Sequence, residues 1–178
     1  MTKLLIHCAT LIEAQTFINF LKLKQNNNLK NLPTNTIIFQ DEDNETLLVV
    51  SGIGKERTFE SLNFVYENFS ITKAIHIGLA SCCDSSIKIG SLFCTNKLLN
   101  NINFASITTV DIPLQTDEGL ETLLVDGNAN YFLDVTKNKS KDVFVFKIVS
   151  DYFELINPDE NFIIPLIEDT YPKINRFF

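Results

Sequence analysis

The stretch that most constrains the fold of this chain runs from Leu47 to Leu92. It contains two apolar segments, Leu47–Val50 and Lys73–Ile77, and each runs directly into a glycine turn. Strand, turn, helix and strand in this order predict a βαβ unit, because parallel strands need a crossover of about this length. The predicted helix has apolar residues at helical spacing, namely Phe59, Leu62, Val65, Tyr66 and Phe69.

A ligand pocket is predicted at one edge of this unit. In open parallel sheets, ligands bind beyond the carboxyl ends of the strands. Gly52, Gly54 and Gly78 follow the two strand segments at those ends, where a residue without a side chain lets the backbone approach a ligand closely. We therefore expect these three glycines to line a pocket.

The remaining pattern predicts a three-layer α/β/α fold with a mixed, mostly parallel central sheet, formed by a single domain over residues 1–178. Further strands are expected at Lys3–Cys8, Thr36–Gln40, Glu45–Val50, Ile87–Asn96, Phe104–Val110 and Val143–Val149. Further helices are expected at Ile12–Leu23, Thr116–Leu124 and Asn128–Asn138. The tail from Asn157 contains two prolines and is compatible with a helix or with an irregular strap.

Charge and hydropathy exclude several classes of partner. The net charge is −7 and no cluster of Lys or Arg stands out, which argues against binding to nucleic acid or to an anionic membrane. No apolar run approaches the roughly 20 residues of a membrane span. The apolar N-terminal run meets Glu13 where a signal peptide would carry small residues, so a cytoplasmic protein is expected.

No metal or cofactor is predicted. The cysteines, Cys8, Cys82, Cys83 and Cys94, form no CxxC pair, and neighbouring cysteines rarely bond to each other, so free thiols are expected. The glycine loop matches neither the GxGxxG nor the Walker spacing, which argues against a dinucleotide or nucleoside triphosphate site. The two histidines lie inside strand segments and are interpreted as core residues: His7 and His76.

Motifs distributed along the chain resemble those of one enzyme superfamily. They are ATLIEAQTF (Ala9–Phe17), VVSGIGKERT (Val49–Thr58), HIGLASCCDSSIKIGSL (His76–Leu92), LVDGNANYF (Leu124–Phe132) and FKIVSDYF (Phe146–Phe153). In these stretches, and in their order, the chain resembles the purine nucleoside phosphorylases and nucleosidases. The resemblance is nearest to methylthioadenosine/S-adenosylhomocysteine nucleosidases and futalosine hydrolases, in a shortened and partly degenerate form.

The resemblance implies cleavage of a nucleoside between base and ribose, without a cofactor, by a homodimer. Glu13 would position or deprotonate the attacking water, and Asp151 would protonate the leaving base. Without the resemblance, Glu13 is also explained as an acid in the first turn of a helix and Asp151 as a helix N-cap. The resemblance further implies that Asn128 holds ribose and that Asp111 and Ile112 lie in the segment framing the base.

Departures from the family pattern leave a second function open. Gly127-Asn128 stands where the family has Met-Glu, and a neutral hydrogen bond contributes about 0.5–1.5 kcal/mol against about 1.5–3 kcal/mol for a charged one. Between Cys94 and Ile107 the chain also lacks a long loop and helix that the family normally has. The two hypotheses are a nucleosidase and a catalytically inactive relative that binds a nucleoside or a protein partner. Phosphorolysis is disfavoured because Ala9–Ile12 offers no arginine for phosphate.

Overall fold

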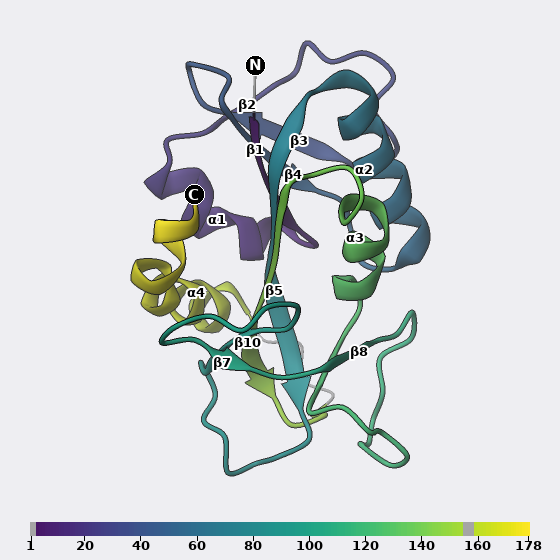
Figure 1. The fold of residues 1–178 in the computed structure, drawn as a ribbon, viewed down its shortest axis with the longest axis vertical. Coiled ribbons are helices and arrows are strands. Elements are labelled where there is room, and N and C mark those ends of the chain that lie inside the picture. Colours follow the sequence, from purple (N-terminus) through teal and green to yellow (C-terminus); the bar gives the residue numbers. More distant parts are fainter. Residues whose placement is uncertain (1–2, 155–158) are drawn as a thin grey trace.

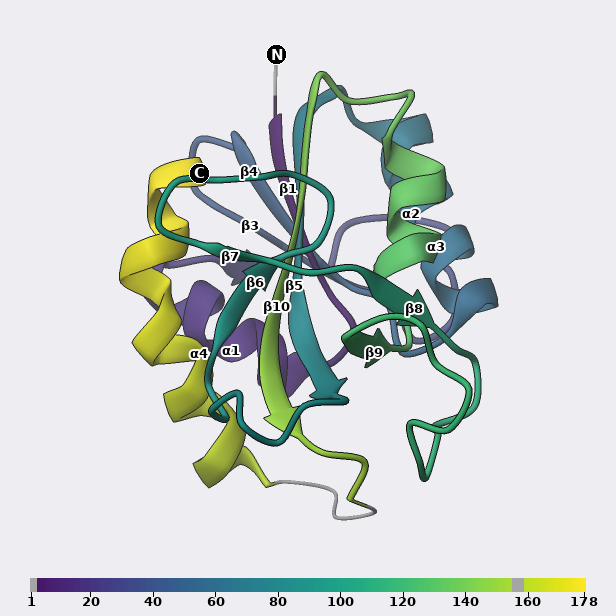
Figure 2. The same cartoon turned by 60° about the horizontal axis from the view of Figure 1, so that its bottom comes forward.

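A mixed, mostly parallel sheet forms the centre of the computed structural model, which describes residues 3–154 and 159–178. The strand order is β2-β3-β4-β1-β5-β10-β6-β7, and β9 pairs with the end of β5 and with β8 (Figures 1 and 2). The strands are β1 (Lys3–Cys8), β2 (Lys24–Gln25), β3 (Ile37–Gln40), β4 (Thr46–Val50), β5 (Ile71–Cys82), β6 (Leu92–Cys94), β7 (Asn103–Phe104), β8 (Ile107–Thr109), β9 (Leu124–Asp126) and β10 (Asp142–Asp151).

The four central strands, β4, β1, β5 and β10, pair in parallel. Antiparallel pairs extend the sheet on both sides, through β2 and β3 next to β4 and through β6 next to β10. The carboxyl ends of β1, β5 and β10 therefore meet at one edge, which is where the sequence predicts a pocket.

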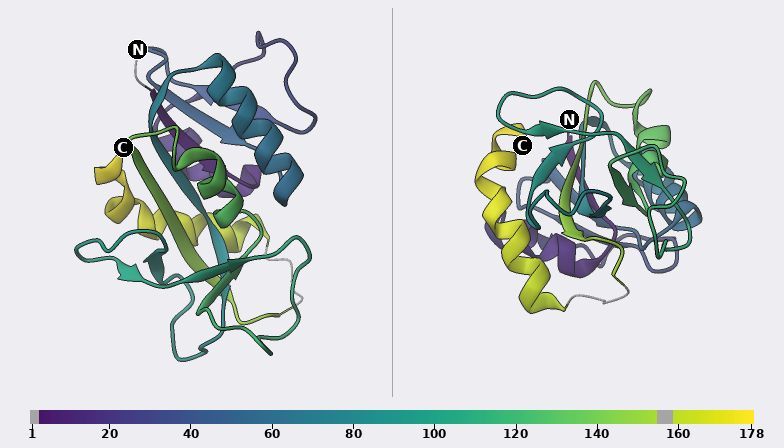
Figure 3. Two further views of the ribbon diagram at one scale, coloured as in Figure 1. Left: turned by 45° about the vertical axis from the view of Figure 1, so that its right-hand side comes forward. Right: turned by 90° about the horizontal axis from the view of Figure 1, so that it is seen from below.

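Helices cover both faces of the sheet. They are α1 (Leu11–Phe20), α2 (Lys55–Asn68), α3 (Ala129–Thr136) and α4 (Glu160–Ile174), followed by a short 3₁₀ turn, Asn175–Phe177. Helices α1 and α4 lie on one face and α2 and α3 on the other, as Figure 2 and both views of Figure 3 show. This arrangement confirms the predicted three-layer α/β/α fold.

The sheet separates two hydrophobic clusters, one on each face, and strand β10 contributes side chains to both. Phe146 and Ile148 pack into the cluster that contains α1 and α4, whereas Val143 and Val145 pack into the cluster that contains α2 and α3. Side chains alternate between the faces of a strand, so Lys147 lies on the same face as Val145. Lys147 therefore lies on the face of the sheet that α2 and α3 cover, together with a group of buried polar side chains that includes Asp126 and His76.

Several predicted elements are confirmed and others are wrong. Lys3–Cys8 is a strand as predicted, and the tail forms helix α4, with Asp159 as its N-cap. The predicted helix Thr116–Leu124 is wrong: Gly119 turns with φ +80°, and the segment ends in β9, which is held by pairing to β5 and β8. The predicted strand Ile87–Asn96 is reduced to β6, because Gly90 turns with φ +86°.

Strand β5 is longer than its predicted apolar segment and runs through Gly78 to Cys82. The predicted strand Phe104–Val110 is divided between β7 and β8. Among the helices of the described ranges, none combines the length and the apolar character needed to cross a membrane.

Candidate functional site

Glu13 links the first helix to the central strand of the sheet. Thr10 is the N-cap of α1 and forms a capping box with Glu13, whose Oε2 accepts from the backbone N–H of Thr10 at 2.9 Å. Its other oxygen, Oε1, accepts from the backbone N–H of Leu79 on β5 at 3.0 Å. The side chain thus has the first-turn role that the sequence allows, and it also turns one carboxylate oxygen toward β5.

Asp151 is fixed to the same strand. It ends β10, and its Oδ1 accepts from the Ser81 hydroxyl at 2.6 Å and from the Phe153 N–H at 3.0 Å. Its Oδ2 accepts from the Ser150 hydroxyl at 2.6 Å. Asp151 does not cap α4, which has Asp159 as its N-cap. Glu13 and Asp151 are therefore anchored to residues two apart on β5.

A buried ion pair lies beside Glu13. The Nζ of Lys147 is 2.6 Å from Oδ2 of Asp126, and only 3% and 2% of the two side chains are exposed. Asp126 also accepts from the backbone N–H groups of Asn128 and Ala129 at 3.0 and 2.7 Å, and from the Thr109 hydroxyl at 2.6 Å. A buried charge requires such pairing and hydrogen bonding, and here both are present.

Sequence reasoning missed both members of this ion pair. Each is a single charged residue in an otherwise apolar strand, Lys147 within FVFKIV and Asp126 at the end of LLVD. A lone charge in a buried strand requires a partner of opposite sign, so this signal was available in the sequence.

Gly78 brings Glu13 and Lys147 to the same point. Lys147 lies opposite Gly78 in the β5–β10 register. A Cβ atom added at Gly78 would lie 3.0 Å from Oε1 of Glu13 and 3.0 Å from Nζ of Lys147. These contacts are tighter than nine in ten real Cβ contacts, so the position favours glycine.

The two histidines are fully buried next to this group, as predicted for core residues. Nδ1 of His7 and Nδ1 of His76 are 2.8 Å apart, and Nε2 of His7 is 2.8 Å from the Ser51 hydroxyl. Burial and, next, the positive charge of Lys147 lower the pKa of His7 from 6.5 to about 3. The same causes lower the pKa of His76 well below 6.5, so both rings are neutral at pH 7.

The other predicted site residues gather at the start of α2. Gly52 and Gly54 have φ of +90° and +101°, which favours glycine. Asp111 accepts from the backbone N–H of Lys55 at 3.1 Å. A cavity of about 550 Å³ lies here, lined by Ile53, Gly54, Lys55, Glu56, Arg57, Phe59 and Asp111.

Asn128 connects these two groups of residues. Its Nδ2 donates to the Gly52 carbonyl at 3.0 Å and to the Thr58 hydroxyl at 2.7 Å, so both amide hydrogens are used within the chain. Its backbone N–H binds Asp126. Ile112, by contrast, is 78% exposed and contributes its side chain mainly to the surface.

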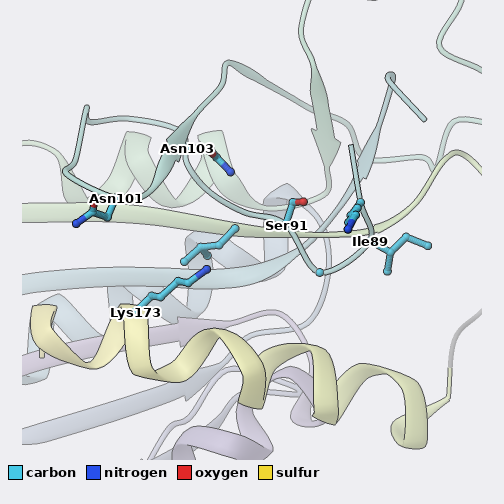
Figure 4. A pocket seen from close by; sticks show the side chains of 8 residues that line it. Ile89, Ser91, Asn101, Asn103 and Lys173 are labelled. Atoms are coloured by element: carbon cyan, nitrogen blue, oxygen red, sulfur yellow. The ribbon is translucent and has the colours of Figure 1, made fainter. Parts of the chain in front are cut away.

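Two further cavities lie elsewhere. One, of about 350 Å³, is lined by Lys88, Ile89, Gly90, Ser91, Leu92, Asn101, Asn103 and Lys173, with Lys173 reaching from α4 toward the sheet (Figure 4). The other, of about 470 Å³, is lined by residues of α1 and α4. Glu13 and Asp151 line none of these three cavities of the described chain.

Comparison with solved structures shows that the chain has the fold of known nucleosidases. It is similar to the 5′-methylthioadenosine/S-adenosyl homocysteine nucleosidase of Campylobacter jejuni, with a TM-score of 0.77 and 17% identity over 98% of this chain and 97% of that one. It is also similar to a futalosine hydrolase mutant of Helicobacter pylori strain 26695, with a TM-score of 0.77 and 10% identity over 99% of this chain and 98% of that one. A third similar structure is the 5′-methylthioadenosine/S-adenosylhomocysteine nucleosidase of S. pneumoniae with a transition-state inhibitor. Its TM-score is 0.76, with 17% identity over 99% of this chain and 98% of that one.

At the level of sequence, no family model and no curated protein matches this chain. The fold that the resemblance of the motifs implied is thus confirmed.

Proposed function

We propose that this protein hydrolyses the N-glycosidic bond of a purine nucleoside. The observation that supports this function is the anchoring of Glu13 and Asp151 to β5, through Leu79 N–H and the Ser81 hydroxyl. Two carboxyl groups held by one rigid strand keep a fixed separation, which a reaction with an acid and a base at opposite ends of the scissile bond requires.

In the proposed reaction, Asp151 donates a proton to the base as the C1′–N bond breaks. Positive charge develops on the ribose, and water forms the new bond to C1′ while Glu13 accepts its proton. Gly52, Gly54, Gly78, Asp111 and Ile112 are the proposed lining of the substrate pocket. No step requires a metal or a cofactor.

Water is a better nucleophile for this site than phosphate. Glu13 is only 7% exposed and would repel an anion in a poorly solvated place, and the loop that precedes it offers no arginine. We further propose a homodimer as the working form, which sedimentation analysis would test.

A second candidate function is nucleoside binding without catalysis. The geometry of Asn128 favours it, because the amide hydrogens that would bind ribose hydroxyls are directed to Gly52 and Thr58. A protein of this kind would retain the fold and bind a nucleoside or a protein partner.

A base-release assay by liquid chromatography separates the two functions. The substrates are methylthioadenosine, S-adenosylhomocysteine, futalosine and inosine, each with and without phosphate. The nucleosidase hypothesis predicts release without phosphate by the wild type and its loss in Asp151→Asn. Thermal stabilisation by a nucleoside with no base release supports the binding protein, and a phosphate requirement contradicts the hydrolase.

A further inference from the structure

One buried polar atom near Glu13 lacks a hydrogen-bond partner in the described part of the chain. Nε2 of His76 forms no hydrogen bond with any residue that the structure describes, although the side chain is fully buried. Oδ2 of Asp126 lies 3.9 Å from this nitrogen, which is too long for a hydrogen bond. Whether this nitrogen donates or accepts depends on the tautomer of His76.

The contacts of the opposite nitrogen determine that tautomer. Nδ1 of His76 is 3.2 Å from the carbonyl oxygen of His7 and 2.8 Å from Nδ1 of His7. A carbonyl oxygen only accepts, so Nδ1 of His76 carries the hydrogen and Nδ1 of His7 accepts. Nε2 of His7 then donates to the Ser51 hydroxyl, which donates to the Gly52 carbonyl at 2.8 Å.

The alternative set of tautomers, with the hydrogens on Nδ1 of His7 and Nε2 of His76, is less favourable. It would withdraw a donor from two carbonyl oxygens, those of His7 and Gly52. It would also direct an N–H of His76 toward Asp126 across 3.9 Å, where that oxygen already accepts from Lys147, Asn128 and Ala129. Nε2 of His76 is therefore a buried acceptor that needs a donor.

The neighbourhood of Gly78 contains groups that complement this acceptor. The Cβ position of Gly78 lies 3.6 Å from Cε1 of His76 and 3.0 Å from both Oε1 of Glu13 and Nζ of Lys147. Two acceptors, Oε1 of Glu13 and Nε2 of His76, and one cationic donor, Nζ of Lys147, therefore belong to side chains that surround the same side of Gly78. Water has two hydrogens for the acceptors and a lone pair for the ammonium, and its second lone pair remains free.

We propose that His76, Glu13 and Lys147 together bind one water molecule beside Gly78, and that His76 is a positioning residue which accepts a hydrogen bond from it through Nε2. The further assignment of this water as the nucleophile of hydrolysis rests on the proposed function. Its oxygen bonds to C1′ as the C1′–N bond breaks, one proton passes to Glu13, and Asp151 supplies the proton of the departing base. The other O–H stays directed at His76, which fixes the orientation of the reacting lone pair.

Two structural measurements test the site without any reference to activity. Long-range ¹H–¹⁵N NMR spectra should show His76 as the Nδ1–H tautomer and His7 as the Nε2–H tautomer. A high-resolution crystal structure should show a water within about 3.2 Å of Nε2 of His76 and Oε1 of Glu13. An Nε2–H tautomer of His76, or a crystal structure without this water, overturns the proposal.

A pair of variants tests the positioning role in the base-release assay. His76→Leu removes the acceptor and should lower kcat by about 10²-fold with KM nearly unchanged. His76→Gln places an amide oxygen near the position of Nε2 and should recover part of that loss, provided that both variants show wild-type circular dichroism. Equal rates in the wild type and His76→Leu overturn the positioning role. If the wild type releases no base while NMR and crystallography show the water, the proposed function fails and the water site stands.

Discussion

The ammonium group of Lys147 and the carboxylate of Asp126 meet at 2.6 Å inside the protein, between β10 and the start of α3. The pair connects the two groups of predicted site residues, because Lys147 faces Glu13 and Gly78, whereas Asp126 binds the backbone of Asn128. It therefore holds the helix that carries Asn128 against the strand that ends in Asp151.

Removing only the positive member of this pair should strongly destabilise the fold. Lys147→Met leaves Asp126 as an unpaired buried charge, and we expect the free energy of unfolding to fall by about 3–5 kcal/mol. Urea denaturation followed by circular dichroism measures this change.

The matched control is the double variant Lys147→Met, Asp126→Asn, which removes both charges. It should recover part of the lost stability, because a neutral amide costs less to bury than an unpaired carboxylate. A double variant less stable than the Lys147→Met single variant would contradict this account of the pair.

The buried histidines should make stability depend on pH. The pKa of His7 is lowered from 6.5 to about 3, first by burial and then by Lys147, and the pKa of His76 is lowered well below 6.5. Below pH 6.5 the unfolded chain therefore binds more protons than the folded chain, and acidification favours unfolding. The contribution of the neutral histidines to the free energy of unfolding is fully present above pH 6.5 and is lost progressively as the pH falls toward 3.

The measurement is urea denaturation at several values between about pH 5 and pH 8, a window above the ordinary pKa of carboxyl groups. Each histidine should add a slope approaching about 1.4 kcal/mol per pH unit below its unfolded-state pKa. The chain contains only these two histidines, so His7→Gln should reduce the slope by roughly half. A free energy of unfolding that stays constant across the window would contradict neutral burial.

Adding a methyl group at Gly78 should disturb both Glu13 and Lys147. A Cβ 3.0 Å from each of their polar atoms forces one of them to move, and overpacking of this kind costs about 1–3 kcal/mol. We expect Gly78→Ala to abolish base release together with this loss of stability.

Gly119→Ala is the control for Gly78→Ala. Gly119 has φ +80° and no atom within 4 Å of its Cβ position. The loss of stability in this variant therefore arises from backbone strain alone, and the surroundings of Glu13 and Lys147 are unchanged. Base release should then be unchanged. Full activity in Gly78→Ala would exclude the close arrangement of Glu13 and Lys147.

Asn128 should be sensitive to an exchange of its amide for a carboxylate. Asn128→Asp replaces a donor by an acceptor that faces the Gly52 carbonyl and adds a second negative charge near Asp126. The free energy of unfolding should fall by about 2–3 kcal/mol at pH 7. Asn19→Asp is the control, since Asn19 is exposed and uses its carbonyl oxygen as an acceptor. Similar unfolding midpoints for the two variants would argue against the internal role of Asn128.

The sequence by itself determined the layers of this protein. Short continuous apolar runs predict β1, β4 and the core of β10, because strands buried on both faces are apolar throughout. Helical spacing of apolar residues predicts α2, which buries one face. The motifs placed Glu13 and Asp151 at strand ends, and the solved nucleosidases confirm the fold that the motifs implied.

Only the tertiary structure decided what these residues touch. The segment 116–124 begins with residues typical of a helix start, yet Gly119 turns with φ +80° and Leu124 is paired in β9 with β5 and β8. The Lys147–Asp126 pair joins residues on different elements, and local periodicity carries no information about such contacts. The same holds for Asn128, whose amide donates inward to Gly52 and Thr58, and for Nε2 of His76, which forms no hydrogen bond within residues 3–154 and 159–178.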